Sequence, residues 1–315
     1  MERKILFSDK SLYRDDFRVT AFHFGSEEKT VCIVGSTRGN ENQQLFTCAM
    51  LIRELERLER EGKLNLSSGI TVIPCCNPYS INIRKRFWPI DNTDINRMFP
   101  GYDKGETTQR IAAAIFESVR GYKYGIQFAS FYRSGYFIPH VRVMDTGYYN
   151  DPAKAKEFGL PYVVIHQPRP FDTTTLNYNW QVFETQAFSV YTTNTPRIYK
   201  PSAEDGMRAV LRFLRSEGII TEDIAPGVES VVVSNDDFIP VRSAEAGFFY
   251  ASVKAGAHVR KGDVLAQIMD SYTLKVLDTL YSPVDGTVAF VYDEAMTYAD
   301  TAVIKVCAKQ SQQRP

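Results

Sequence analysis

A short apolar run near the start of the chain leads directly into a glycine and then into a long amphipathic segment. Residues 31–34 (VCIV) are all apolar and end at Gly35, which is typical of a central strand buried on both faces. Residues 43–61 then carry leucine and isoleucine at helical spacing, with most charges on the other face. A buried strand that leads into such a helix predicts a sheet covered by helices.

The same alternation of strand and helix patterns continues along the first two thirds of the chain. We expect further strands at residues 69–76, 124–128, 162–165 and 187–191, and helices at 107–119 and 202–217. Alternating elements of this kind predict an α/β fold, with a mostly parallel mixed sheet flanked by helices on both faces.

The pattern changes after the turn sequence Ala225-Pro226-Gly227. Short β-like runs follow at residues 230–233, 247–251, 263–268 and 287–291, separated by Gly, Pro and Asp and without a helical pattern between them. Such spacing is typical of a barrel or a sandwich. We therefore expect an α/β domain at residues 1–227 and an all-β module at residues 228–315.

Composition excludes several classes of protein. Lys plus Arg and Asp plus Glu both number 37, so the formal net charge is zero, which argues against binding to nucleic acid or to a membrane surface. The first ten residues have no long apolar core, and no run approaches the roughly 18 apolar residues of a membrane helix. Five cysteines without paired spacing favour a reduced, cytoplasmic compartment. A homo-oligomer or a protein partner stays open.

A dense polar segment, residues 77–101, follows one of the predicted strands. The carboxyl end of a strand is where open α/β sheets bind ligands. Guanidinium groups bind carboxylates through paired hydrogen bonds, and an adjacent amide adds a donor and an acceptor. Arg86, Asn96 and Arg97 therefore describe a pocket for a carboxylate or a polarised carbonyl. The alternative is a solvated loop whose arginines pair with nearby aspartates.

Short motifs spread over nearly the whole chain carry a family resemblance. They are Gly39-Asn40-Glu41, Asn77-Pro78, DINRMFPG at 94–101, PHVR at 139–142, and, in the β module, GFF at 247–249, VRKGDVL at 259–265 and SPVDG at 282–286. Together with Arg86 they resemble the succinylglutamate desuccinylase/aspartoacylase family of the zinc carboxypeptidase-like superfamily, whose C-terminal domain is lipoyl-like.

This resemblance implies a fold, an activity and a set of site residues. Members of the family are zinc amidohydrolases that cleave N-acyl amino acids or related amides. Two histidines and a glutamate hold the zinc ion, and a second glutamate acts as general base. By resemblance, Glu41 stands at the zinc-binding glutamate, Arg86 at the residue that stabilises the oxyanion, and Asn96 and Arg97 at the pair that holds the substrate carboxylate.

Three positions depart from the family pattern. Arg38 and Ala129 stand in place of the two zinc-binding histidines, so Glu41 is the one metal-ligand position retained. Neither replacement offers a lone pair to a metal, and a catalytic zinc ion normally has three protein ligands. Tyr191 stands at the general-base position, but a phenol with a reference pKa near 10 is not a base at neutral pH. The sequence therefore assigns no residue a catalytic role, and no cofactor is expected.

Other residues offer alternative roles near the expected site. Cys75 and Cys76 end a predicted strand and could contribute to a rebuilt metal site, although a free cysteine in a strand is more often a small buried hydrophobe. His140 is a candidate for contact with the substrate. Arg142 lies two residues further on, so both side chains point the same way if this segment is a strand.

The sequence therefore favours a catalytically degenerate family member, a pseudoenzyme, that binds a small anionic amide or N-acyl amino acid. Arg38 would supply a fixed positive charge in place of zinc and, with Arg86, Arg97 and Arg142, would form an anion pocket that serves a binding or partner-subunit role. Two alternatives stay open. In the first, the protein is an active amidohydrolase with an unconventional zinc site. In the second, Arg38 pairs with Glu41 and closes the pocket.

Overall fold

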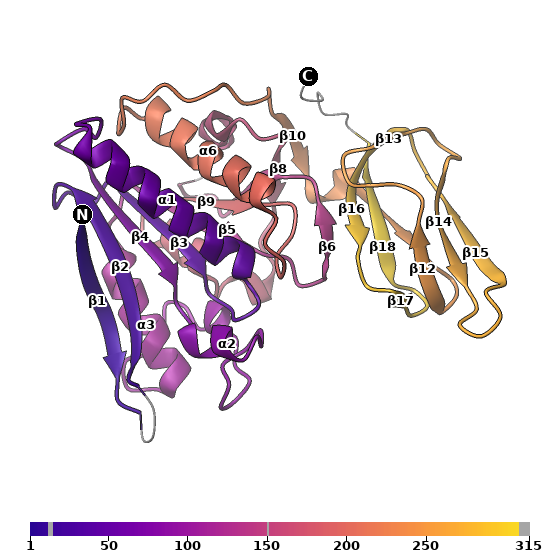
Figure 1. The fold of residues 1–315 in the computed structure, drawn as a ribbon, viewed down its shortest axis with the longest axis horizontal. Helices are drawn as coiled ribbons and strands as arrows, with labels where there is room; N and C mark the ends of the chain where they lie inside the picture. Colours follow the sequence, from indigo (N-terminus) through magenta and orange to yellow (C-terminus); the bar gives the residue numbers. More distant parts are fainter. Residues whose placement is uncertain (12–14, 150, 309–315) are drawn as a thin grey trace.

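The computed structural model of the chain describes residues 1–11, 15–149 and 151–308 and contains one large sheet covered by helices (Figure 1). The predicted α/β class is confirmed. The sheet has nine strands. In chain order they are β1 (Glu2–Asp9), β2 (Phe17–Gly25), β3 (Val31–Ser36), β4 (Gly69–Cys75), β5 (Tyr124–Ala129), β7 (His140–Met144), β8 (Tyr162–His166), β9 (Gln186–Tyr191) and β10 (Val231–Ser234).

The large sheet is mixed, and the expectation that it is mostly parallel is not confirmed. Its order is β1-β2-β4-β3-β5-β9-β7-β8-β10. Parallel ladders join β4, β3, β5 and β9, and join β7, β8 and β10, but β7 is antiparallel to β9. The chain turns back after β5 without a helical crossover, and a parallel return would need one. The β1–β2 and β2–β4 ladders are also antiparallel.

In the described part of the chain, six α-helices and four short 3₁₀ helices lie between the strands. They are α1 (Asn42–Arg60), α2 (Pro78–Asn82), α3 (Thr107–Val119), α4 (Pro152–Ala155), α5 (Leu176–Val182), α6 (Lys200–Ser216), η1 (Ile95–Arg97), η2 (Lys156–Phe158), η3 (Pro170–Asp172) and η4 (Asn235–Asp237). The predicted helices at 43–61, 107–119 and 202–217 are confirmed to within two residues. The last begins earlier because Pro201 fits the first turn of a helix, where its missing N–H is not needed.

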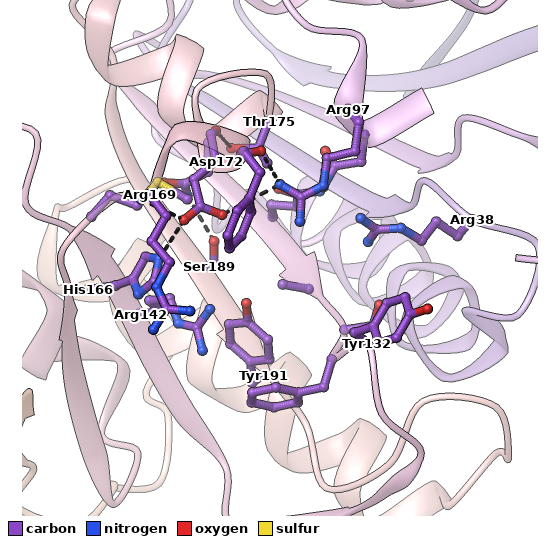
Figure 2. Close-up of a pocket in the computed structure, with 18 of the residues that line it drawn as sticks. Arg38, Arg97, Tyr132, Arg142, His166, Arg169, Asp172, Thr175, Ser189 and Tyr191 are labelled. Atoms are coloured by element: carbon purple, nitrogen blue, oxygen red, sulfur yellow. Dashed lines mark hydrogen bonds and ion pairs between the residues drawn. The ribbon is translucent and has the colours of Figure 1, made fainter. Parts of the chain in front are cut away.

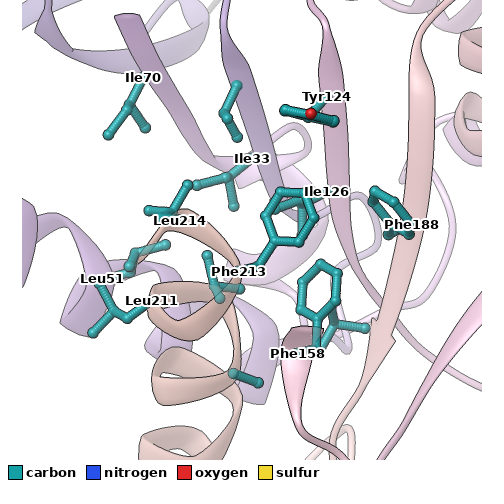
Figure 3. Close-up of a cluster of buried hydrophobic side chains, with 14 of the residues drawn as sticks. Ile33, Leu51, Ile70, Tyr124, Ile126, Phe158, Phe188, Leu211, Phe213 and Leu214 are labelled. Carbon is teal, nitrogen blue, oxygen red and sulfur yellow. The ribbon is translucent and has the colours of Figure 1, made fainter. Parts of the chain in front are cut away.

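Both faces of the sheet are buried, as the continuous apolar run of β3 requires. Ile33 points to one face and packs in a cluster with Leu51 of α1 and Leu214 of α6 (Figure 3). Val34 points to the other face and belongs to a second cluster with Trp180 of α5. Successive side chains of a strand alternate between faces, so a strand between two helical layers must be apolar at every position.

Two further sheets are built mostly from the C-terminal part of the chain, drawn in orange and yellow in Figure 1, and one of them also includes a short magenta strand from residues 135–137. Their strands are β6 (Gly135–Phe137), β11 (Phe238–Arg242), β12 (Gly247–Ala251), β13 (His258–Val259), β14 (Val264–Met269), β15 (Val276–Tyr281), β16 (Gly286–Tyr292), β17 (Met296–Thr297) and β18 (Ala302–Cys307). Every ladder in these sheets is antiparallel across the described residues. These strands agree with the β-rich character predicted for this region.

Two segments cross the predicted boundary at residue 227. Strand β10 follows that boundary yet pairs with β8 in the large sheet. Strand β6 precedes it yet pairs with β16 in the C-terminal region. The two regions are thus joined by backbone ladders, and the division at residue 227 stays a prediction. Among the described residues, no helix combines the length and the apolar character needed to cross a membrane.

Candidate functional site: an arginine-lined cavity

A cavity of about 270 Å³ lies over the face of the sheet that also carries α3 and α5, near the carboxyl ends of β5 and β9. Gln127 of β5 and Ser189 of β9 contribute to its floor. The next residue of each strand, Phe128 and Val190, points to the opposite face of the sheet. Its cationic lining residues are Arg38, Arg86, Arg97, Arg142 and Arg169, and Asn96, Ala129, Ser130, Phe131, Tyr132, Met144, His166, Phe171, Asp172, Thr175, Asn177, Tyr191 and Asn235 also line it (Figure 2).

Arg38 is buried at one side of this cavity and pairs with two acids. Its Nη1 atom donates to Oε1 of Glu41 at 3.0 Å, and its Nε atom lies 2.9 and 3.0 Å from the carboxylate oxygens of Asp94. The side chain is 5% exposed. Burial alone would lower the pKa of Arg38, but the two carboxylates raise it above its usual value. Arg38 is therefore a permanent cation with its charge balanced.

The carboxylate of Glu41 has its hydrogen-bonding capacity filled by its own neighbours. Oε2 accepts the backbone N–H groups of Thr37 at 2.7 Å and Arg38 at 3.0 Å. Oε1 accepts from Arg38 and from the hydroxyl of Ser130. These four bonds fill the roughly four lone-pair positions of a carboxylate, and the Thr37 hydroxyl makes a fifth, longer contact with Oε2 at 3.2 Å. Glu41 acts here as the anchor of the turn between β3 and α1.

Arg86 carries the least compensated charge at this side of the cavity. Its Nε and Nη1 atoms are buried and have no hydrogen-bond partner among the described residues, and Nη2 is 3.8 Å from Asp94. The rings of Phe87 and Tyr132 pack on its guanidinium group, with ring centres 5.7 and 5.2 Å from the guanidinium carbon. Burial first, and then the nearby charge of Arg38, lower the pKa of Arg86 to about 10. An anion bound in the cavity would offset this lowering of the Arg86 pKa, because it would stabilise the charged guanidinium group.

Asn96 and Arg97 both reach the cavity from η1. Asp94 fixes this turn because its side chain accepts the backbone N–H of Asn96 at 3.0 Å. The Asn96 amide oxygen lies 3.4 Å from the side-chain nitrogen of Gln127. Arg97 donates to the carbonyl of Phe171 and lies 3.5 Å from Asp172. The predicted trio of Arg86, Asn96 and Arg97 is thus brought to one cavity.

Asp172 holds the opposite wall together and was not singled out from the sequence. Its Oδ2 atom lies 2.9 Å from Nε2 of His166 and accepts the backbone N–H of Arg169 at 3.0 Å, while Oδ1 faces Arg97. Burial raises the pKa of this acid, but the bonds from His166 and Arg169 outweigh burial and bring it to about 2. The sequence feature that could have identified Asp172 is its position three residues after Arg169, in the segment that follows the predicted strand at residues 162–165.

Tyr191, Arg142 and His140 form a stacked group on strands β9 and β7. The His140 and Tyr191 rings lie 4.6 Å apart and nearly parallel, and the Arg142 guanidinium carbon lies 4.7 Å from the centre of the Tyr191 ring. Tyr191 and Arg142 line the cavity, but His140 is not among the residues that do so. Burial and the charge of Arg142 lower the pKa of His140 to about 3, so its ring is neutral.

The cysteines at the end of β4 do not reach the cavity. Cys76 is fully buried in the apolar cluster beneath α3, and burial raises the pKa of Cys75 to about 12. Both thiols are therefore protonated near neutral pH, whereas a metal binds the thiolate. Within the described part of the chain, no group of three or more His, Cys, Asp or Glu side chains is arranged to hold a metal ion.

Several further lining residues were missed because no motif marks them. They are Ser130, Phe131, Tyr132, His166, Arg169, Asp172 and Asn177. The loop that follows Ala129 supplies three of them, and the segment between β8 and β9 supplies most of the others. Residues that approach a cavity from loops follow no fixed spacing along the chain, so the sequence alone could not identify them.

Comparison with known proteins gives consistent matches. The family model for the succinylglutamate desuccinylase/aspartoacylase catalytic domain matches residues 27–216. N-alpha-acetyl-L-2,4-diaminobutyric acid deacetylase of Halomonas elongata is 24% identical in an alignment of 255 residues that covers 78% of this chain and 71% of that protein.

Solved structures share the fold at low sequence identity. A succinylglutamate desuccinylase/aspartoacylase from Rhodobacter sphaeroides matches with a TM-score of 0.77 and 20% identity, covering 96% of this chain and 94% of that one. A succinylglutamate desuccinylase from Silicibacter sp. gives 0.80 and 17%, covering 95% and 91%. The product-bound ectoine utilization protein EutE (DoeB) from Ruegeria pomeroyi gives 0.76 and 18%, covering 93% and 90%.

Proposed function

Because this chain belongs to the succinylglutamate desuccinylase/aspartoacylase family, we propose that it binds a small anionic amide or N-acyl amino acid in the arginine-lined cavity without hydrolysing it. The observation that carries the proposal is Arg86. Two of its nitrogens are buried at the wall of that cavity without a partner among the described residues, and unpaired buried donors of a charged group are costly unless a ligand satisfies them.

The balance of charge at the cavity supports an anionic ligand. Arg38 is neutralised by Glu41 and Asp94, and Arg97 faces Asp172. Arg86, Arg142 and Arg169 also line the cavity, whereas Asp172 is the one acid among the described lining residues. A carboxylate ligand would supply the missing negative charge and accept paired hydrogen bonds from a guanidinium group.

The donor set does not fit the zinc ion that the family fold implies. The oxygens of Glu41 already accept hydrogen bonds from Thr37, Arg38 and Ser130. Ala129 has no ligand atom in its side chain, and the Arg38 cation would repel a metal. We therefore propose that Arg38 takes the place of the metal as a fixed cation whose charge Glu41 and Asp94 balance, and that amide hydrolysis is lost, with Tyr191 unable to act as a base.

The wider role follows from binding without turnover. We propose that the protein acts in the cytoplasm as a binding protein or as a partner subunit. In this view residues 228–315 form a lipoyl-like module, and its contact with the cavity-lining loop through β6 and β16 couples the module to the ligand. The relative that is a deacetylase suggests the chemical class of the ligand, an N-acyl amino acid.

A binding experiment tests the proposal. N-acetyl-L-aspartate and N-acetyl-L-glutamate would be titrated into the protein by calorimetry and by thermal shift, with their neutral methyl esters as controls. We expect the acids to bind and the esters not to bind. Arg86→Gln should weaken binding roughly tenfold or more, since hydrogen bonds to charged groups contribute about 1.5–3 kcal/mol. The control Arg208→Gln removes a partly exposed arginine paired with Asp205 on α6 and should bind normally.

The same preparation also tests the loss of hydrolysis. The protein would be purified without chelator, its zinc content measured by elemental analysis, and N-acyl amino acids assayed with added zinc. Absence of turnover with ligand binding supports the proposal. Stoichiometric zinc with turnover would instead establish an active amidohydrolase with an unconventional metal site. Failure of every acid to bind, with Arg86→Gln unchanged in stability, would favour a closed pocket.

A further inference from the structure

The geometry points to a positioning role for Tyr191: we infer that its ring holds the Arg142 guanidinium group in place as an anchor for an anionic group of the ligand. This inference rests on the proposed binding function. It concerns the position at which the family resemblance places a general-base glutamate. The substitution to tyrosine would thus exchange a group that moves protons for a surface that orients a cation.

The strand register places these side chains together. Strands β7 and β9 are antiparallel, with His140 directly opposite Tyr191 and Arg142 opposite Ser189. Residues two apart on a strand point to the same face, so His140 and Arg142 both lie on the face that carries the Tyr191 ring. Diagonal neighbours across such a ladder are within reach of aromatic and long side chains, and the contacts follow from this register.

The Tyr191 ring is itself fixed by its neighbours. It is 7% exposed, stacks on the His140 ring at an angle of 10°, and contacts the Phe131 ring at a centroid distance of 4.4 Å. Phe131 in turn stacks on Phe137 of β6 at 3.5 Å. A ring confined on several sides is a rigid surface, and the Arg142 guanidinium carbon lies 4.7 Å from its centre and 5.6 Å from that of Phe131.

The positive charge of Arg142 is left available to a ligand. Within the described residues Arg142 forms no ion pair, and its buried Nε atom has no hydrogen-bond partner. His140 is neutral, so it does not pair with Arg142. Lys305 of β18 adds a second positive charge nearby, and Arg142 and Lys305 both line a small cavity next to the main one. Figure 2 shows Arg142 beside Tyr191 at one side of the main cavity and Arg38 at the other.

A phenol ring and a carboxylate would affect Arg142 in opposite ways. A glutamate at position 191 would pair with the guanidinium group and neutralise it, so that it could not hold a second anion. An aromatic ring attracts the cation through its face without cancelling the charge. Tyr191 therefore both orients Arg142 and leaves it free for the ligand, and the hydroxyl group is not needed for this role.

Three substitutions separate the ring from the hydroxyl. Tyr191→Phe keeps the ring, Tyr191→Leu removes it, and Arg142→Gln removes the cation. With N-acetyl-L-glutamate as the probe, we expect Tyr191→Phe to bind within about twofold of the wild type. Tyr191→Leu should bind about tenfold more weakly, in line with a desolvated cation–π contact. In the Arg142→Gln background, Tyr191→Leu should have little further effect. Tyr191→Met replaces Tyr191→Leu if the latter does not fold.

A second readout does not depend on the ligand. Phenylglyoxal modifies accessible arginines, and peptide mass spectrometry reports the rate at Arg142. We expect Arg142 to react equally slowly in the wild type and in Tyr191→Phe, and several-fold faster in Tyr191→Leu. If this holds while the wild type binds no N-acyl amino acid, the proposed function fails and the positioning role stands. Equal rates in all three proteins, or a loss of binding in Tyr191→Phe as large as in Tyr191→Leu, would overturn the inference.

Discussion

Arg38 and Glu41 form an ion pair of 3.0 Å at the turn between β3 and α1, with side chains that are 5% and 1% exposed. Asp94 completes the group from a distant loop at 2.9 Å. The attraction between buried charges offsets the cost of taking them out of water only when geometry and hydrogen bonding are good, and removal of one partner leaves the others uncompensated. This group therefore joins two loops at the edge of the cavity.

The first prediction concerns stability. Arg38→Met leaves Glu41 and Asp94 buried without their cation, so we expect a loss of about 3–5 kcal/mol in the free energy of unfolding. Urea denaturation followed by circular dichroism measures it. The matched control Arg208→Met removes a partly exposed partner of Asp205 and should change stability by less than about 1 kcal/mol. A similar small change in Arg38→Met would show that the group contributes little.

The second prediction concerns zinc. Arg38→His alone should not bind zinc stoichiometrically, because Ala129 still leaves the site one ligand short of the usual three. Together with Glu41, the double variant Arg38→His/Ala129→His supplies three ligands and should bind zinc more tightly than either single variant. Elemental analysis after dialysis against a zinc buffer measures both. Stoichiometric zinc in the wild type or in Arg38→His would contradict the prediction.

The sequence predicted the buried strand β3 and the polar segment after β4 because local patterns determine both. An apolar run requires cover on both faces, and arginines that follow a strand gather at one edge of a sheet. It did not predict that Arg38 is shared between Glu41 and Asp94, since Asp94 comes from a loop 56 residues away. Contacts of that kind depend on how loops fold over the sheet.

His140 shows a different limit of sequence reasoning. A substrate-contacting or structural role was expected for it, and contact with a substrate stays a prediction; in the structure its ring stacks against Tyr191, and it is not among the residues that line the main cavity. Strand alternation correctly predicted that His140 and Arg142 lie on the same face. It carries no information about which of the two is covered by the Tyr191 ring. The antiparallel pairing of β7 with β9 decides that, and the expected mostly parallel sheet did not include it.

The third prediction concerns Asp172. Its pKa in the folded protein, about 2, lies below its ordinary value of about 3.9. The carboxylate therefore stabilises the fold fully above pH 4, and this contribution is lost as the pH falls towards 2. Asp172→Asn should reduce stability at pH 7, with the difference from the wild type shrinking below pH 4. It should also strengthen binding of N-acetyl-L-glutamate, because it removes the one acid among the described lining residues and leaves Arg97 free for the ligand's carboxylate.

Urea unfolding of both proteins at pH 7, 4 and 3 checks the first part of the Asp172 prediction, and calorimetry at pH 7 checks the second. Asp205→Asn is the matched control, because Asp205 also faces an arginine but lies on α6 away from the cavity. A stability difference that is constant across these pH values would show that the ionisation of Asp172 is not what stabilises the wall.

The last prediction concerns His140, whose pKa in the folded protein is lowered to about 3 by burial and by the nearby charges of Arg142 and Lys305. In the unfolded chain the same ring takes up a proton near pH 6.5. The unfolded state therefore binds more protons between these values, and His140 should reduce stability by up to about 1.4 kcal/mol for each pH unit below 6.5. His140→Gln keeps a donor for the Ile138 carbonyl but cannot titrate, so its stability should fall less steeply between pH 6.5 and 4.

Urea unfolding across this pH range measures the difference in stability. The control is His258→Gln, which replaces an exposed histidine of β13. Parallel curves for the wild type and His140→Gln would show that His140 is protonated in the folded protein and that its ring is not held neutral behind Tyr191.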